Sequence, residues 1–256
     1  MDQASILERP YINITNIIWS FDRTTNEVNI LLVKRNTDPF NEYWALPETF
    51  MRENESAGQS ALRLVKDKIG MVLSHSHTEQ LETFTNYQRT PGDRTLSLAY
   101  MTFLPDQPTL KPGYGASDAR WFSMSYTDQA YSFTNGDLTF YTAPSENEAQ
   151  YYSDFKKSGR SGKHLAFDHE WILTVACRRI TNKLDYQPNI LLILGPRFTL
   201  KAARMVYSPF LKLPVVKIDN SNFKKSHSKL FTAVGTSSSS HPGRPANMFK
   251  LKDVFS

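Results

Sequence analysis

The chain has 256 residues, of which 40% are hydrophobic and 12% aromatic, which is enough for two modest folded domains and excludes a disordered chain. Its charge is uneven, because residues 171–256 hold 14 Lys and Arg against 3 Asp and Glu, whereas residues 1–170 hold 16 against 22. A basic last third predicts a partner with many negative charges, although a merely soluble basic domain would show the same balance.

Several classes of protein are excluded by simple features. No apolar run approaches the roughly 20 residues of a membrane span, and the first residues lack the basic end and apolar core of a signal peptide. The one cysteine, Cys177, excludes an internal disulfide and a cysteine-cluster zinc site, so we expect it to be a buried small side chain. We therefore expect a cytoplasmic protein with no membrane partner.

The first half of the chain predicts an α/β domain. We expect strands in the β-rich runs 11–21, 27–35, 81–88, 94–105 and 119–124, with the third and fourth runs forming a hairpin. Between them lies a helix. Ser56 should open it, because Gln59 follows three residues later as in a capping box, and Gly70 should end it.

The second half predicts a different, helical module. Residues 125–163 resemble an insertion, with a small hairpin at 135–144 and a basic loop at 156–163. We place a domain boundary there, giving domains 1–163 and 164–256. Further on we expect helices at 168–184, 198–211 and 218–231, a short buried strand or apolar turn at 189–194, and a hairpin with a Ser-rich tip at 232–252. Thr199 and Asp219 are the candidate N-caps of the last two helices.

The stretch ALPETFMRENESAGQSALRLVKDKIGM, residues 45–71, carries the candidate chemistry. A diphosphate hydrolase needs Mg²⁺, which is held by carboxylates that share one face of a helix. This helix instead offers Leu64, Lys66, Asp67 and Lys68. An ordinary capped amphipathic helix is the alternative interpretation of the stretch.

The same stretch resembles the Nudix box, in which a glycine, five residues, Glu, seven residues and Arg-Glu precede a Glu pair and a glycine. Glu55, Arg63 and Gly70 match in register. Four positions differ: Thr49 replaces the first glycine, Leu64 the Glu after Arg, and Asp67 and Lys68 the Glu pair. Two of three metal carboxylates are therefore missing, and Lys68 would repel a cation. The resemblance thus predicts a box that binds Mg²⁺ poorly and has no catalytic residues.

The last two predicted helices, joined by a short turn, suit a DNA-binding helix-turn-helix. The candidate DNA contacts are Asn222, Lys224, Lys225 and Lys229 on the second helix, and Arg244, Lys250 and Lys252 on the hairpin that follows. Such a hairpin would act as a wing that touches phosphates or the minor groove. A solvated basic helix pair is the alternative.

The landmarks WALPETFMRENES, SDARWF, LAFDHEWI, FTLKAARMVY and GRPANMFKL occur in an order that resembles the Nudix-related transcriptional regulators of NAD metabolism. This resemblance implies a Nudix-like α/β sandwich with a mixed sheet, followed by a winged helix-turn-helix domain. It implies a dimeric repressor that needs no cofactor, binds an ADP-ribose-like effector, and binds duplex operator DNA near genes of NAD biosynthesis or salvage. By position, the effector pocket would include Arg35, Trp44, Phe50, Arg52, Glu53 and Arg94.

The chemistry of these residues agrees with a nucleotide ligand in outline. Arg can grip a diphosphate with two parallel hydrogen bonds, and an aromatic ring can stack on adenine. Trp44 and Phe50 could equally be core residues, and His164 and His169 are interpreted as packing residues at the domain junction. Two alternatives stay open: a Mg²⁺-dependent hydrolase of ADP-ribose or another nucleoside diphosphate derivative that uses Asp67 and Glu55, and a nucleic-acid-binding protein that senses no nucleotide.

Overall fold

A mixed β-sheet forms the centre of the protein, as a computed structural model shows for residues 9–70, 72–73, 77–113, 115–127, 129–145, 147–157, 163–236 and 245–252. The sheet has the order β5-β6-β1-β2-β7-β8-β9, with β3 paired to β2 and β4 to β1. Its strands are β1 (Tyr11–Asp22), β2 (Glu27–Arg35), β3 (Trp44–Ala45), β4 (Glu48–Phe50), β5 (Thr78–Phe84), β6 (Thr95–Leu104), β7 (Ala116–Tyr126), β8 (Tyr131–Asn135) and β9 (Leu138–Tyr141). Strands β1 and β6 run parallel, whereas β1 and β2 are antiparallel.

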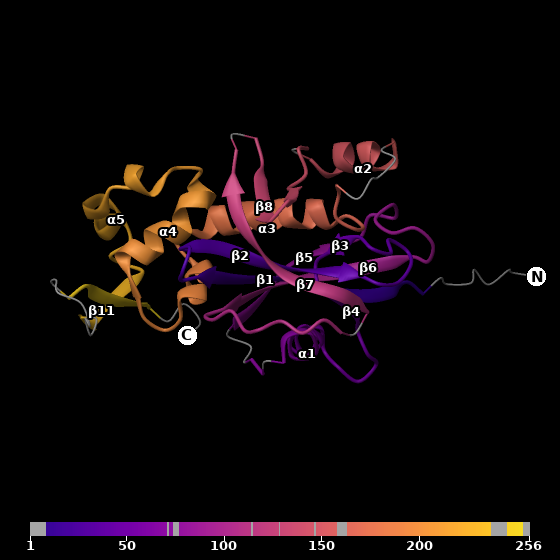
Figure 1. The fold of residues 1–256 in the computed structure, drawn as a ribbon, viewed down its shortest axis with the longest axis horizontal. Helices are drawn as coiled ribbons and strands as arrows, with labels where there is room; N and C mark the ends of the chain where they lie inside the picture. The colour runs from indigo at the N-terminus through magenta and orange to yellow at the C-terminus, as the bar shows by residue number, and fades with distance from the viewer. Residues whose placement is uncertain are drawn as a thin grey trace, which may run out of the picture.

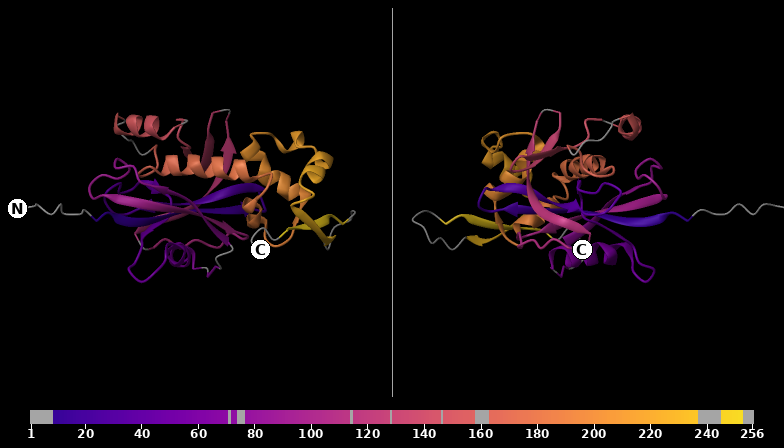
Figure 2. Two further views of the ribbon diagram at one scale, coloured as in Figure 1. Left: turned by 180° about the vertical axis from the view of Figure 1, so that it is seen from behind. Right: turned by 45° about the vertical axis from the view of Figure 1, so that its right-hand side comes forward.

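Helices cover both faces of this sheet (Figure 1). Helix α1 (Ala57–Ile69) lies on one face, and α3 (His169–Lys183) runs along the other, with α2 (Glu148–Lys157) beyond it. The views in Figure 2 place the C-terminal elements together at one end of α3. The predicted α/β class with a mixed sheet and a following winged helix domain is confirmed.

Helix α1 begins and ends where its sequence predicts. The Ser56 hydroxyl accepts a hydrogen bond from the Gln59 N–H, and the Gln59 side chain accepts one from the Ser56 N–H, so the capping box is complete. Gly70 ends the helix with φ 76°, in the left-handed region that favours glycine. These caps fix both the entry and the exit of the Nudix-box helix.

The region that resembles an insertion is partly helical. The predicted hairpin is present as β8 and β9, which turn at Gly136 with φ 57°. The sequence did not predict α2, and the last two residues of this helix fall in the predicted loop 156–163. Residues 158–162 of that loop lie outside the described residues. The repeated aromatic residues of α2 had no clear period from which a helix could be predicted.

The C-terminal elements form a compact winged helix. Helix α4 (Leu200–Leu211) has Thr199 as its N-cap, and α5 (Asn220–Ser226) has Asp219. Between them lies the short helix η3 (Val215–Lys217), and the strands β10 (Phe198–Thr199), β11 (Phe231–Thr236) and β12 (Asn247–Leu251) form a sheet in the order β10-β12-β11. Helix α5 ends at Ser226 rather than at residue 231, because the chain turns there into β11.

Residues 189–194 form the buried 3₁₀ helix η2 (Asn189–Leu194), so the predicted strand is wrong and the apolar turn is right. A short apolar run does not distinguish a strand from a buried turn by periodicity.

None of the described helices is long and apolar enough to cross a membrane.

One hydrophobic core connects the sheet, α3 and the winged helix. The Trp19 ring of β1 packs against Phe133 of β8 and Phe210 of α4, with ring centroids 6.3 and 5.7 Å apart. Cys177 of α3 is fully buried in the same cluster, as expected, and burial raises the pKa of its thiol. The core therefore continues across the boundary predicted between residues 163 and 164.

Candidate functional site

A polar cleft of about 510 Å³ lies where β1, β2, β4, the loop between β5 and β6 and the segment before α3 meet. A smaller hollow of about 270 Å³ continues it toward α1. The two share Asn13, Arg35, Thr37, Glu48 and Phe50 in their walls. A cleft of this size with few charged groups matches the dimensions of small-molecule sites in proteins.

Arg35 and Glu48 form the central ion pair of the cleft. Arg35 Nη1 lies 2.5 Å from Glu48 Oε1, its Nε donates to the Pro39 carbonyl at 3.1 Å, and its guanidinium lies 4.7 Å from the centroid of the Phe167 ring. Asn13 Nδ2 donates to the other oxygen of Glu48 at 2.8 Å. The guanidinium thus lies over the Phe167 ring at the wall of the cleft, where it is paired with Glu48.

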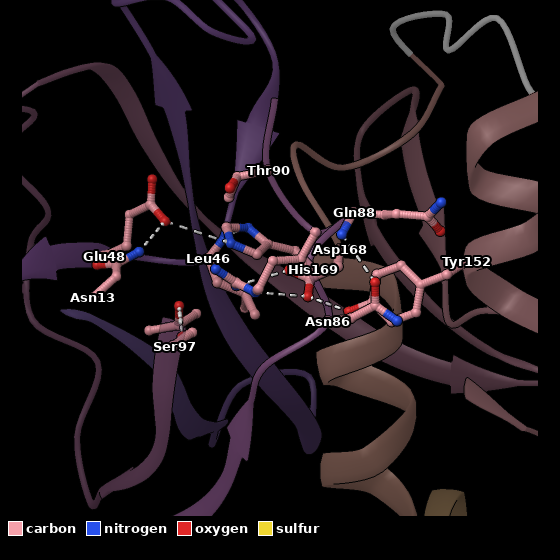
Figure 3. A network of polar contacts seen from close by, with 12 residues as sticks. Asn13, Leu46, Glu48, Asn86, Gln88, Thr90, Ser97, Tyr152, Asp168 and His169 are labelled. Atoms are coloured by element: carbon pink, nitrogen blue, oxygen red, sulfur yellow. Dashed lines mark hydrogen bonds and ion pairs between the residues drawn. The ribbon is translucent and has the colours of Figure 1, made fainter. Parts of the chain in front are cut away.

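Glu48 also faces His169, the first residue of α3 (Figure 3). The buried His169 ring accepts the Leu46 N–H at Nδ1, 3.0 Å away, so in the neutral ring Nε2 carries the proton. That Nε2 lies 3.7 Å from Glu48 Oε2. Burial alone would raise the pKa of Glu48, but His169, Arg35 and Asn13 together lower it to about 2. Glu48 is therefore a carboxylate that links the cleft to the start of α3.

A second, fully buried ion pair lies beside His169. Arg89, from the loop between β5 and β6, donates to Asp168 through Nε at 3.1 Å and Nη2 at 2.9 Å. The Tyr152 hydroxyl of α2 donates to the same carboxylate at 2.6 Å, and burial raises the pKa of that hydroxyl. Figure 3 shows Glu48 and Asn13 on one side of His169, with Asp168 and Tyr152 on the other. This network joins the β5–β6 loop, α2 and α3 at one point.

Glu55, in the loop before α1, forms an ion pair with Arg63 of that helix. Arg63 donates to both carboxylate oxygens, through Nε at 2.8 Å and Nη2 at 2.6 Å, while Ser60 Oγ and the Arg52 N–H donate at 2.5 and 2.7 Å. Chiefly because of the hydrogen bond from Arg63, the pKa of Glu55 falls to about 2. The pair holds the loop before α1 onto the helix, since Arg63 also donates to the Phe50 carbonyl at 3.0 Å.

The other box positions have separate roles in the fold. Leu64 is 1% exposed and is part of the buried face of α1. Asp67 lies 3.6 Å from Arg63, and Lys68 Nζ donates to the Gly113 carbonyl at 3.1 Å while lining the smaller hollow. Over the described part of the chain, no three His, Cys, Asp or Glu side chains are grouped as a metal site.

Of the six residues predicted for the effector pocket, two line the cleft and the other four lie elsewhere in the structure. Arg35 and Phe50 line the cleft. Trp44 is 5% exposed and packs edge-on against Phe122, 5.1 Å between centroids, so it belongs to the core. Arg52 and Glu53 are exposed beyond the walls of both hollows, and Arg94 donates to the Thr85 carbonyl.

Sequence reasoning missed several residues of the site. Among those that line the cleft are Asn13, Glu48, Thr90, Asp93 and Phe167. The available signal was polarity inside apolar strands, because Asn13 and Thr95 interrupt β1 and β6 on the side that faces the cleft. Arg89 gave no signal, since it lies within a run, RTPGD, that is typical of a turn.

The predicted DNA-contacting side chains that the structure describes are exposed, on α5, just after it and on the wing strand β12. Asn222, Lys224 and Lys225 of α5 are exposed, as are Lys229 after it and Lys250 of β12. Arg244 lies outside the described residues. The opposite side of α5 is buried, with Phe223 packed edge-on against Tyr207 at 5.0 Å. The helix thus presents amide and ammonium groups to solvent from a rigid aromatic base, as a recognition helix does.

The far end of α3 is fastened to α4 of the winged helix. The Tyr131 hydroxyl of β8 donates to the Phe210 carbonyl at 3.2 Å, and the Thr181 hydroxyl of α3 donates to the same carbonyl at 3.4 Å. The Tyr207 hydroxyl donates to the Leu184 carbonyl at 2.8 Å, just past the end of α3. Helix α3 therefore spans from His169, beside Glu48, to the base of the winged helix.

Two family models match the chain. Residues 14–142 match the NUDIX domain, and residues 190–251 match the NrtR DNA-binding winged helix domain. Helix α3 falls between the two matched ranges. The match to the first range covers the sheet and the Nudix-box helix, and the match to the second covers α4, α5 and the wing.

Individual relatives match most of the chain. The ADPR responsive transcriptional repressor NtrR of Acinetobacter baylyi is 22% identical over 211 residues, 82% of this chain and 70% of the relative. A MutT/nudix family protein from Enterococcus faecalis is 28% identical with a TM-score of 0.81, over 96% of this chain and 87% of that one. Shewanella oneidensis NrtR, crystallised with a 27mer DNA, is 23% identical with a TM-score of 0.64, over 94% and 93% of the two chains, and has the same fold.

Proposed function

The chain belongs to the Nudix family and carries an NrtR-type DNA-binding winged helix domain, and from this premise we propose that it is a transcriptional regulator whose Nudix domain senses ADP-ribose or a related nucleotide. Its partners are duplex operator DNA and the nucleotide, and it acts as a repressor of genes for NAD biosynthesis or salvage. The Acinetobacter relative, which is an ADPR responsive repressor, supports this proposal.

One observation carries the proposal: a polar cleft at one end of α3 and a DNA-binding module at the other belong to a single core. His169 opens α3 next to Glu48 in the cleft, and Thr181 near its end contacts Phe210 of α4. A ligand that displaces Glu48 would shift the start of α3, and a rigid helix passes such a shift to whatever packs on its other end. Allosteric couplings of about 1–3 kcal/mol are typical for such devices.

The cleft offers groups that suit a nucleotide. Phe50 and Tyr11 have exposed rings, 60% and 56%, whose centroids lie 5.7 Å apart at the rim. Either can stack on an adenine ring. Asp93 is an exposed residue of the cleft wall, and its carboxylate can accept hydrogen bonds from ribose hydroxyls. Arg35 suits the diphosphate between them.

The test needs DNA that the protein recognises, so duplexes would first be selected from fragmented genomic DNA by binding to the full chain. Fluorescence anisotropy of a selected duplex would then be followed while ADP-ribose, AMP or ribose 5-phosphate is added. We expect ADP-ribose to release the DNA and the two fragments to act weakly, because each lacks part of the ligand. Selected DNA whose binding is unchanged by all three compounds contradicts the sensing role and favours a regulator that senses no nucleotide.

The DNA-binding surface is tested in the same assay. Lys224→Ala with Lys225→Ala should weaken binding to every duplex and lower the slope of log affinity against log salt, by about 0.9 for each phosphate that is no longer neutralised. Lys201→Ala is a matched control, because Lys201 is exposed on α4, outside the predicted DNA contacts. A double variant that binds like the parent would mean that α5 does not read DNA.

We also propose that the protein is a dimer formed through the Nudix domain. Dimeric helix-turn-helix proteins bind half-sites about 34–36 Å apart, one turn of the DNA helix. The selected duplexes should therefore contain an inverted repeat with that spacing, and light scattering should give twice the chain mass. A monomer at working concentration with single unrepeated sites would contradict this assembly.

A further inference from the structure

The Nudix-box helix does not present the ligands of a divalent cation. Mg²⁺ prefers octahedral oxygen coordination and needs carboxylates that are available to it. Here both oxygens of Glu55 already accept hydrogen bonds from Arg63, and Leu64 is a buried hydrocarbon. Asp67 is the one acid within α1, and it lies 3.6 Å from the Arg63 guanidinium. One carboxylate paired with a cation does not make a magnesium site.

A different positive charge lies at the same end of the cleft. Lys68, half-buried in the last turn of α1, lines the smaller hollow together with Arg35, Glu48 and Thr49. Its Nζ donates to the Gly113 carbonyl at 3.1 Å, which holds the ammonium at the wall of the hollow. Burial lowers the pKa of Lys68, while Glu48 and Asp67 oppose that effect. An anion that entered the hollow would favour the charged form further.

Two exposed acids line only the larger hollow, whereas Glu48 lines both. Asp38 and Asp93 are exposed walls of the larger hollow and do not line the smaller one, whereas Lys68 lines only the smaller. The positive charge of Lys68 at one end of the cleft would attract the phosphates of a ligand, and the negative charges of Asp38 and Asp93 at the other end would repel them. Together they would orient a ligand that carries phosphates next to hydroxyl groups. The phosphates would lie toward α1, and the ribose hydroxyls toward Asp93.

On the basis of the proposed function, we propose that Lys68 and Arg35 together hold the diphosphate of the nucleotide directly, so that the Lys68 ammonium replaces the metal ion and binding needs no Mg²⁺. These two cations face the two negative charges of a diphosphate diester, and Glu48, which now pairs with Arg35, is the one acid among the described residues that line the same hollow. An ammonium neutralises phosphate charge but cannot coordinate and activate a water molecule, which is the second task of a catalytic metal. The substitution therefore preserves a binding site while removing the attacking group.

Calorimetry of the full chain with ADP-ribose tests the proposal directly, in buffer with Mg²⁺ and in buffer with EDTA. We expect the same affinity in both. Affinity that falls at least tenfold in EDTA would overturn the role of Lys68 and leave the sensing function intact. No binding in either buffer would overturn both, and the two failures are therefore distinguishable.

A pair of variants on the same helix tests the residue itself. Lys68→Met removes the charge and keeps the length of the side chain, and we expect affinity in EDTA to fall about 10- to 100-fold, the effect of losing one charged hydrogen bond. Lys66→Met is the matched control on the exposed face of α1, and its affinity should not change. Lys68→Arg, which restores a cation, should recover most of the loss.

Folding of the variants is checked by thermal melting without ligand and by DNA affinity without nucleotide. We expect both to match the parent for Lys68→Met. Parent-like nucleotide affinity in a folded Lys68→Met protein would show that the ammonium does not hold the ligand.

Discussion

The two ends of the cleft are held by ion pairs of opposite character. At α1, Arg63 and Glu55 keep 17% and 12% of their side-chain surface exposed. At α3, Arg89 and Asp168 are 1% and 0% exposed, and Tyr152 adds a third hydrogen bond. The first pair keeps the shape of a Nudix loop whose metal carboxylates are largely replaced, whereas the second fixes the point from which α3 departs. The matched motif and the more deeply buried of the two ion pairs are therefore in different places.

Breaking the buried pair should give the largest effect. Asp168→Ala leaves the Arg89 charge buried without its partner, which typically costs about 3–5 kcal/mol of unfolding free energy. Urea unfolding followed by fluorescence measures this change. Asp118→Ala is the control, because Asp118 pairs with Arg120 on the surface and such pairs contribute at most about 1 kcal/mol. Similar losses in the two variants would remove the contrast between buried and exposed pairs.

Breaking the pair at α1 should cost less. Glu55→Gln keeps an acceptor for Arg63 but loses the charge, so we expect a loss of about 1.5–3 kcal/mol, the range for a hydrogen bond to a charged group. The fold should stay intact, because Arg63 still donates to the Phe50 carbonyl. If Glu55→Gln destabilises the protein more than Asp168→Ala, the ranking of the two ends is wrong.

Acid should weaken both ends of the cleft in a defined window. The pKa values of Glu48 and Glu55 are about 2 in the fold, against an ordinary value of 4.5. Between these values the unfolded chain binds more protons than the fold, so stability rises with pH there. The contribution is complete above about pH 4.5 and lost as the pH falls toward 2. The urea midpoint should decline over this window, and more shallowly in Glu55→Gln, which has lost one of the two groups.

The smallest expected effect is catalytic. With Leu64 and Lys68 at metal positions, we expect ADP-ribose cleavage in the presence of Mg²⁺ to stay below about one turnover per second, the low end for enzymes. Chromatography of AMP release gives the measurement. Turnover at or above that rate would favour the hydrolase alternative and would mean that the α1 end of the cleft is catalytic.

The elements with local signals could be predicted from the sequence. Ser56 and Gln59 predicted the start of α1 because a capping box is formed within four residues. Asp219 likewise predicted the start of α5. Arg89 could not be assigned, since its partner Asp168 lies 79 residues away and a buried Arg in a turn looks like a surface residue. For Trp44 a local signal gave the wrong environment. Its place in the motif indicated the cleft, but the pleat of β3 directs its side chain into the core.

The single core described above has a consequence for how this protein can be taken apart. Cutting at residue 163 would strip α3 from the sheet and leave the face around Trp19 and Phe133 open to water, since α3 and α4 cover it. We therefore expect the full chain to melt in one cooperative step. A chimera that exchanges the Nudix domain or the winged helix domain would have to keep α3 together with the sheet face that packs on it. A substitution in the core on the sheet face would need a matching substitution on α3 or α4.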